Sequence, residues 1–298
     1  MSQGNNVFSG ITQAQLTAVD NVLYETALST LKARKLIKPI TLQPYQTSYS
    51  YRTIKRYGQA HWVGENSNEQ GTSGEDYDQE FRQISTYATG VSYTQDELLQ
   101  SQAAGINLST EQATTVGRAM GEFEEKAVWL GDKKKNIPGI VGIADKERTD
   151  KATATFEDMK PEDIYEYLRI QRNKLVTQPG MNGIKPLLVL PVYAATALTK
   201  RYSDYDARPL SQVLADAGWF SSIETVDMLE QATGASKGCG LMFDASSTTM
   251  NLLIGENLNA GPVVGPDEDF IYKIPYRART GGVIVRQPYH VIQMNGLE

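Results

Sequence analysis

The sequence has little of the chemistry that metal centres and disulfide frameworks need. It contains one cysteine, Cys239, and two histidines, His61 and His290, in 298 residues. A lone cysteine cannot close an internal disulfide, and neither histidine has ligand-type residues at a suitable spacing. We therefore expect no metal site, and a protein that is made in a reducing compartment.

The sequence also lacks an excess of positive charge. Its 29 Lys and Arg residues are outnumbered by 35 Asp and Glu residues, which gives a formal net charge of -6. Proteins that grip nucleic acid usually carry a concentrated basic patch, and the basic run Lys133–Lys135 is too short to be a strong signal. We expect no sequence-specific nucleic-acid binding. A protein that only encloses nucleic acid would not need a basic surface.

Long hydrophobic runs are missing as well. No apolar run approaches the roughly 20 residues that span a bilayer, and residues 1–10 lack the basic and apolar regions of a signal peptide. Hydrophobic residues make up 40% of the chain and charged residues 21%, as in ordinary globular proteins. These features predict a soluble cytosolic protein, with no membrane contact, that can bury a sizeable core.

The motif that comes nearest to an enzyme signature is TGASKGCG at residues 233–240. It matches the TGxxxGxG pattern of short-chain dehydrogenases, in which glycines let a pyrophosphate approach a helix N-terminus. That pattern belongs after the first strand of a chain and before a helix, whereas here it lies near the C-terminus and leads into the apolar residues LMF. A glycine-rich surface loop is the simpler interpretation, and nicotinamide binding would be needed to revive the enzyme hypothesis.

Other catalytic arrangements are missing from the sequence. It has no GxxxxGK(S/T) phosphate loop and no GxSxG elbow. The consecutive carboxylates Asp267–Asp269 do not converge as a catalytic pair, and Glu124 and Glu125 are most simply helix-surface charges. We therefore expect no catalytic residue, no cofactor and no enzyme activity.

The first third of the chain predicts an arm, a helix and a long hairpin. Residues 1–11 are polar and form the arm, and apolar residues at helical spacing predict a helix over Thr12–Lys35. Strand-type alternation runs over Tyr45–Val63 and returns over 77–94, on either side of the polar, glycine-rich stretch 64–76. Because a lone hairpin buries too little surface to be stable, its aromatic residues need either the rest of the subunit or a neighbouring subunit.

The clearest helix is predicted over residues 109–130. Ser109 and Gln112 form a capping box, and Gly131 stands where a C-terminal capping glycine belongs. An apolar stripe follows one side, formed by Ala113, Val116, Met120, Phe123, Ala127 and Leu130. The remaining surface is charged, so we expect this helix to cover another element with one side only.

From about residue 151 the pattern becomes α/β. A helix is predicted over Pro161–Val176, followed by a strand at 187–191 and helices near 192–202 and 210–217. The later strands are predicted at 222–229, 240–244, 251–256 and, as two or three strands broken by Gly281-Gly282 and Pro288, at 271–295.

Three local phrases and the order of the parts carry a family resemblance. The phrases are ALSTLKARKLIKPI at 27–40, WLGDKKKNIPGIVG at 129–142 and PLLVLPVYAATAL at 186–198. With these phrases, and with an arm and helix, a long hairpin, a long amphipathic helix and an α/β part in that order, the chain resembles the fold shared by tailed-bacteriophage major capsid proteins and encapsulins. The resemblance implies an α+β phage major-capsid fold with an N-arm, an extended β-hairpin (E-loop), a P-domain with a long spine helix, and an α/β A-domain.

The resemblance also implies a division of the chain. The expected parts are the N-terminal arm and helix at 1–40, the E-loop hairpin at 41–94, the P-domain spine helix and turn at 95–150, the A-domain at 151–269, and the P-domain return strands at 270–298.

What the resemblance implies about function is a structural role. Copies of the chain would form pentamers and hexamers of an icosahedral shell that encloses double-stranded DNA, in virions assembled in the cytoplasm of a host bacterium. Scaffolding, portal and decoration proteins would be further partners. An encapsulin-like compartment that holds cargo enzymes is the alternative, and a soluble α/β enzyme is the less favoured one.

Contacts between subunits are expected in two places, the hairpin and the loop near the axis of each capsomer. The candidate residues are Tyr57, Trp62 and Phe81 in the hairpin, and Asp204, Tyr205 and Arg208 in the loop.

Overall fold

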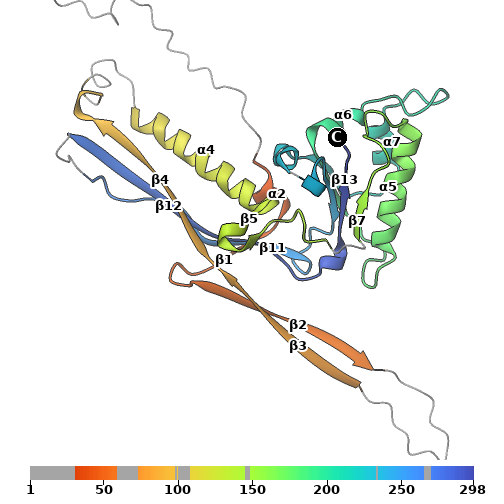
Figure 1. Cartoon of the computed structure of the whole chain (residues 1–298), viewed down its shortest axis with the longest axis horizontal. Helices are drawn as coiled ribbons and strands as arrows, with labels where there is room; N and C mark the ends of the chain where they lie inside the picture. The colour runs from red at the N-terminus through yellow and green to blue at the C-terminus, as the bar shows by residue number, and fades with distance from the viewer. Residues whose placement is uncertain are drawn as a thin grey trace, which may run out of the picture.

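The computed structural model describes residues 31–58, 73–97, 99, 108–144, 148–232, 234–264 and 270–298. These residues form two sheets that follow one another along the molecule, and a two-stranded hairpin projects away from them (Figure 1).

A four-stranded sheet and the helix α4 (Leu108–Trp129) form one end of the molecule. In sheet order the strands are β1 (Pro39–Thr41), β11 (Met250–Ala260), β12 (Ile271–Val285) and β4 (Ser85–Thr94). β12 is antiparallel to both β11 and β4, and β1 is parallel to β11. α4 lies along one face of this sheet, where Val116 and Met120 pack against Ala278 (Figure 1).

The predicted long helix is confirmed almost residue for residue. It begins at Leu108, so the predicted cap Ser109 lies inside it, and Gly131 adopts a φ of 76° just after its end, as a capping glycine should. The apolar stripe is correct except at its edge. Phe123 is exposed and stacks on Tyr87 of β4, with ring centroids 5.0 Å apart.

A five-stranded sheet forms the other end of the molecule. In sheet order its strands are β7 (Thr149–Lys151), β13 (Val291–Asn295), β10 (Gly240–Phe243), β8 (Leu187–Leu190) and β9 (Ile223–Thr225). The helices on this end are α5 (Pro161–Val176), α6 (Val192–Ala197) and α7 (Leu210–Asp216). The predicted bounds of α5 are confirmed, and Pro161 occupies the first helical position, where its missing N–H costs nothing.

One continuous core joins the two ends. Alternation along β8 places Leu188 and Leu190 in the cluster with α5, α6 and α7, and turns Val189 to the opposite face. The cluster on that opposite face contains Val189 together with Trp129 at the end of α4 and Leu252 of β11. The two sheets therefore hold each other in a fixed relation.

The hairpin consists of β2 (Ser48–Gly58) and β3 (Ser73–Gln83), paired along their full length. The prediction that residues 77–94 return as one strand of this hairpin is wrong in its second half, because β4 pairs with β12 instead. The chain changes partner at the buried Ile84, whose side chain lies against Gly255. Alternation looks the same on both sides of that residue, so periodicity could not reveal the change.

The C-terminal segment contributes to both sheets. The prediction that Gly281 and Gly282 break the strand is wrong, because β12 continues through both residues. The pairing with β11 shifts register there, which is a β-bulge. β12 then lies in the four-stranded sheet and β13 in the five-stranded one, so the strands of residues 270–298 belong to two different sheets. β11, expected with the A-domain, likewise lies in the four-stranded sheet, because long-range pairing rather than chain order decides sheet membership.

Shorter elements connect these parts. Of the helix predicted over Thr12–Lys35, only its end lies among the described residues, as α2 (Ala33–Leu36). The predicted strand 222–229 stops at Thr225, because a 3-10 helix follows. The other short elements are β5 (Gly131–Asp132), η1 (Lys133–Lys135), β6 (Ile137–Pro138), η3 (Asp227–Gln231), η4 (Gly234–Ser236) and η5 (Pro288–His290). None of the described helices is both long and apolar enough to cross a bilayer.

Candidate assembly surfaces

The hairpin presents two different faces. Side chains alternate along a strand, so the pairing register puts Ile54, Tyr77 and Phe81 on one face and Tyr57, opposite Gly74, on the other. The three side chains of the first face are 44%, 64% and 66% exposed, in that order. The predicted contact residues Tyr57 and Phe81 therefore point in opposite directions and cannot meet one flat partner surface together.

Tyr57 has a partner within the hairpin itself. Its ring covers Gly74 on the neighbouring strand, within 2.6–2.8 Å of where a Cβ on that glycine would stand. An aromatic side chain that shields a cross-strand glycine stabilises a weak strand pair. The third hairpin candidate, Trp62, lies outside the described residues.

The root of the hairpin is fastened to the rest of the subunit. Tyr51 is buried, its hydroxyl donates to Glu80 at 2.5 Å, and the Arg286 guanidinium lies 5.9 Å from its ring centroid. Burial and the Glu80 carboxylate raise the pKa of Tyr51 to about 12. Arg279 of β12 adds hydrogen bonds to the carbonyls of Pro44 and Gln46, so the hairpin leaves the body at a fixed root.

The loop between α6 and α7 is braced from within. Arg208 pairs with Asp206 at 2.6 Å and with Asp216 at 2.7 Å, and this hydrogen bonding lowers the pKa of Asp206 to about 2. The Asp204 carbonyl accepts a hydrogen bond from Arg201. Tyr205, between these braces, is fully exposed.

The three loop candidates thus differ in their exposure and in their contacts within the chain. Asp204 and Tyr205 are available at the surface, whereas the guanidinium of Arg208 is engaged by carboxylates of its own chain. The hairpin runs out below the body of the molecule, whereas α6 and α7, which flank the loop, lie on the body at the upper right (Figure 1).

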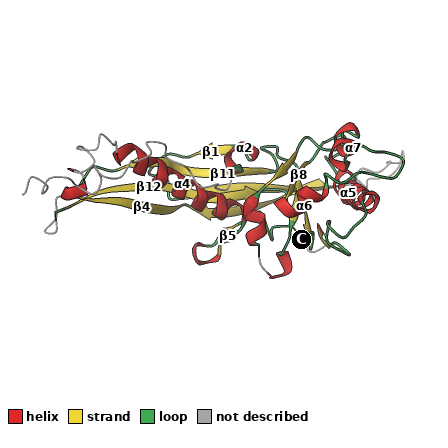
Figure 2. Cartoon of the chain, turned by 90° about the horizontal axis from the view of Figure 1, so that it is seen from above, coloured by secondary structure: helices red, strands yellow, loops and turns green. Residues whose placement is uncertain are grey.

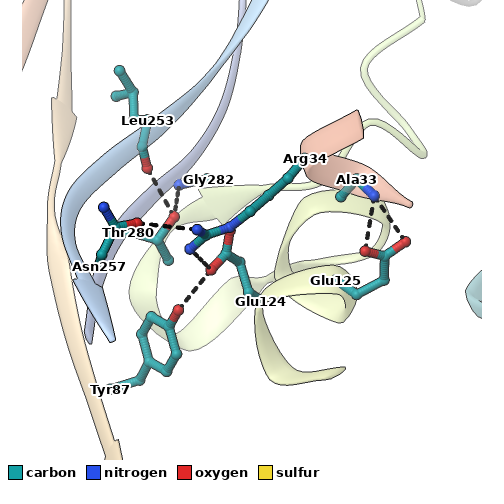
Figure 3. A network of polar contacts seen from close by, with 9 residues as sticks. All are labelled: Ala33, Arg34, Tyr87, Glu124, Glu125, Leu253, Asn257, Thr280 and Gly282. Atoms are coloured by element: carbon teal, nitrogen blue, oxygen red, sulfur yellow. Dashed lines mark hydrogen bonds and ion pairs between the residues drawn. The ribbon is translucent and has the colours of Figure 1, made fainter. Parts of the chain in front are cut away.

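A partly buried polar junction, centred on a buried carboxylate, joins α2, α4, β4 and β11 (Figure 3). Glu124 of α4, which is 5% exposed, accepts two 2.7 Å hydrogen bonds from the Arg34 guanidinium and one of 2.8 Å from the Tyr87 hydroxyl. Arg34 also donates to Asn257 at 3.0 Å. Hydrogen bonding to Glu124 raises the pKa of Arg34, and burial raises the pKa of Tyr87.

Glu125, the next residue, caps a helix from a distance. Its carboxylate accepts hydrogen bonds from the backbone N–H groups of Lys32 and Ala33, at 2.9–3.1 Å, and from the indole N–H of Trp129 at 2.8 Å. No side chain of α2 itself caps its first turn, so Glu125 satisfies donors that would otherwise lack an acceptor. The chain that leads out of the N-terminal segment is thereby fixed to α4.

The prediction that Glu124 and Glu125 are surface charges is therefore wrong. Position 124 lies one turn beyond the buried Met120, and position 125 lies one turn before the buried Trp129. Both positions are therefore on the buried side of the helix. A carboxylate in such a position is a signal for a buried partner, but the partner Arg34 is 90 residues away and cannot be read from spacing.

Two of the remaining enzyme-like features lie largely within the described residues. In the glycine motif at 233–240, the short 3-10 helix η4 is followed by the strand β10 and not by a long helix. This agrees with the apolar residues that follow the motif in the sequence. His290 is buried, with Nδ1 3.4 Å from the Thr249 hydroxyl, and burial lowers its pKa. In the described part of the chain, no group of three or more potential ligands could hold a metal ion.

The fold of the chain is similar to that of several solved structures from phages and virus-like particles. The chain is similar to the capsid of Myoviridae Phage XM1, at 14% identity and a TM-score of 0.80, with 96% of this chain and 99% of that chain covered. It is similar to a Mycobacterium phage Bobi protein at 14% identity and a TM-score of 0.72, covering 96% and 98%. A virus-like particle from Pyrococcus furiosus matches at 15% identity and 0.60, covering 88% and 92%. These likenesses show the fold.

The family follows from the sequence comparison. A search of curated proteins gave no match. The family model described as major capsid protein matches residues 58–297, which include β3, α4 and both sheets almost entirely. The chain belongs to the major capsid protein family.

Proposed function

We propose that copies of this chain assemble as pentamers and hexamers into a closed icosahedral shell that encloses double-stranded DNA. The observation that carries the proposal is the projecting hairpin. Its apolar side chains Ile54, Tyr77 and Phe81 are exposed on a single subunit, and such a surface on a projecting element is typical of a protein–protein contact. Family membership supplies the context, since a capsid is built from many copies of its major protein.

We propose two contact regions for this assembly. The first is the hairpin, with Phe81 as an anchor and Tyr57 and Trp62 as further candidates. The second is the loop between α6 and α7, where the exposed Tyr205 and Asp204 would meet neighbours and Arg208 would keep the loop in shape. In domain terms, the hairpin of β2 and β3 would act as the E-loop, 95–150 as the spine of the P-domain and 151–269 mainly as the A-domain.

DNA would be held by enclosure rather than by recognition. The net charge of -6 offers no general attraction for phosphates. Scaffolding, portal and decoration proteins would be additional partners, and assembly would take place in the cytoplasm of a host bacterium before release as a virion.

A compartment that holds cargo proteins is the second candidate. It is supported by the similarity to the Pyrococcus furiosus virus-like particle, although the TM-score of 0.60 is lower than the 0.80 for the phage XM1 capsid. The contents of native particles distinguish the two, because a DNA container yields nuclease-protected DNA and a cargo compartment yields protein.

The test of the contact regions is assembly of hairpin variants. Phe81→Ala and Trp62→Ala should each reduce the yield of shells in sedimentation and negative-stain imaging. Phe81→Ala should leave the melting temperature of the unassembled subunit unchanged, because this side chain is exposed. Ile170→Ala on α5, also exposed, serves as the matched control. Normal assembly by both hairpin variants would refute the hairpin contact.

A further inference from the structure

The outer strand of the four-stranded sheet has a free edge. β4 is ten residues long, pairs with β12 from end to end without a register shift, and lies at the border of the sheet (Figure 2). Among the described residues no strand pairs with its other edge. That edge carries the backbone N–H and C=O groups that β12 does not use.

Over Ser85–Tyr93 this edge has none of the usual protection in the described structure, whereas the N–H of Thr94 at its end donates to Glu97 at 3.0 Å. Its sequence, STYATGVSYT, contains no charged residue and no proline, and is rich in strand-forming Thr, Tyr and Val. Soluble proteins normally guard exposed edges with charges, proline, bulges or very short strands, because an unguarded edge is a template for another chain.

The other free edges in the described structure do carry such protection. β1, β7 and β9 are three residues long, and β1 begins at Pro39. The strands of the hairpin are long but charged. β2 contains Arg52, Lys55 and Arg56, and β3 contains Glu75, Asp76, Asp78, Glu80 and Arg82. Among the described strands, β4 is thus the long edge without such protection, since the edge of β11 beyond β1 carries Glu256 and register shifts.

We infer that the free edge of β4 is a docking site for an extended strand of a second copy of this chain, added through main-chain hydrogen bonds. The inference rests on the proposed function. Strand addition of this kind satisfies every second backbone group of the edge and gives register through alternate side chains.

Two observations favour a second copy as the occupant. The edge is continuous with the proposed hairpin contact, because only Ile84 separates β4 from β3. The strand is also uncharged, so it offers nothing to select an acidic or basic foreign peptide, whereas a shell supplies copies of the chain at high local concentration.

The surface beside the edge leaves room for the added strand. On the side of the sheet away from α4, the small residues Ala88, Gly90 and Ser92 are exposed next to Lys273 and Pro275. They line a shallow groove of about 470 Å³. Side chains from an added strand can lie over these small residues without a clash.

Hydrogen–deuterium exchange tests the backbone pairing directly. In unassembled subunits, about half of the amides over Ser85–Thr94 should exchange fast, because an edge strand leaves every second N–H unpaired. In assembled shells the same amides should slow by roughly tenfold or more. Amides of α5 serve as the internal control. Equal exchange of β4 in subunits and shells would overturn the inference while leaving shell assembly intact.

Proline substitution separates main-chain pairing from side-chain contact. Of the neighbouring variants Ala88→Pro and Thr89→Pro, one removes an N–H bonded to β12 and the other an N–H at the free edge. The variant with the unchanged subunit melting temperature identifies the outward position, and that variant should fail to assemble. Normal shells from it would refute strand addition. If the wild-type protein formed no shell under any condition, the proposed function itself would fall.

Discussion

Replacement of Glu125 by alanine should destabilise the subunit more than any single exposed charge can. The carboxylate is 3% exposed and accepts hydrogen bonds from the N–H groups of Lys32, Ala33 and Trp129. Alanine would leave these donors without an acceptor in a site that water reaches poorly. Each buried, unsatisfied donor costs about 1–3 kcal/mol, with the half-buried Lys32 at the low end, so the loss is about 3–6 kcal/mol.

Thermal unfolding of the unassembled subunit measures this loss. For a chain of this size 1 kcal/mol corresponds to about 2–3 °C, so Glu125→Ala should lower the melting temperature by roughly 6–18 °C. Glu125→Gln keeps one acceptor oxygen and should lie between wild type and Glu125→Ala.

The matched control for this experiment is Glu122→Ala, on the same helix. Glu122 makes a half-exposed i,i+4 pair with Arg118 at 3.1 Å, which is worth at most about 0.5 kcal/mol. If Glu125→Ala and Glu122→Ala melted within 2 °C of each other, the remote capping of α2 would be refuted.

Three further predictions follow from the structure. Gly282→Ala should cost about 2–4 kcal/mol in urea unfolding, because φ is +70° and Ile137 occupies the Cβ position; Gly142→Ala, strained but open, should cost less, and equal costs would argue against the clash. Stability should fall as the pH rises above about 10, because the folded state keeps the Tyr87 proton that the unfolded state loses; an unchanged alkaline slope in Tyr87→Phe would contradict this. The thiol of Cys239, fully buried with a pKa raised to about 12 by burial, should react with a thiol reagent only on unfolding, and rapid labelling of the native subunit would disprove it.

Local signals predicted the helices well. Pro161 and the acidic residues after it mark the start of α5, and Gly131 marks the end of α4, because each meets a requirement of the helix end itself. The order of these elements was enough for the family resemblance. Such features depend on residues a few positions apart, which is the range over which sequence patterns are informative.

Long-range pairing could not be predicted in the same way. The change of partner at Ile84, the bulge at Gly281 and Gly282, and the placement of β13 beside β10 are decided by segments far away in the sequence. A period of two is identical for either partner sheet.

The contacts of the candidate residues stay a prediction, but the structure shows which of these side chains are exposed. Aromatic residues in an alternating, polar stretch marked the hairpin, and Phe81 is exposed there. The register that turns Tyr57 to the other face, and the ion pairs that engage Arg208, required the structure. The ten uncharged residues of β4 were visible in the sequence, but their meaning depends on β4 being an edge.

The size and content of native particles test the central claim most directly. The purified protein should sediment as capsomers or megadalton shells, and negative-stain imaging should show closed hollow particles that protect double-stranded DNA from nuclease. If the protein stayed a monodisperse monomer or dimer at every salt and protein concentration tested, the proposal that it forms a DNA-enclosing shell would be contradicted.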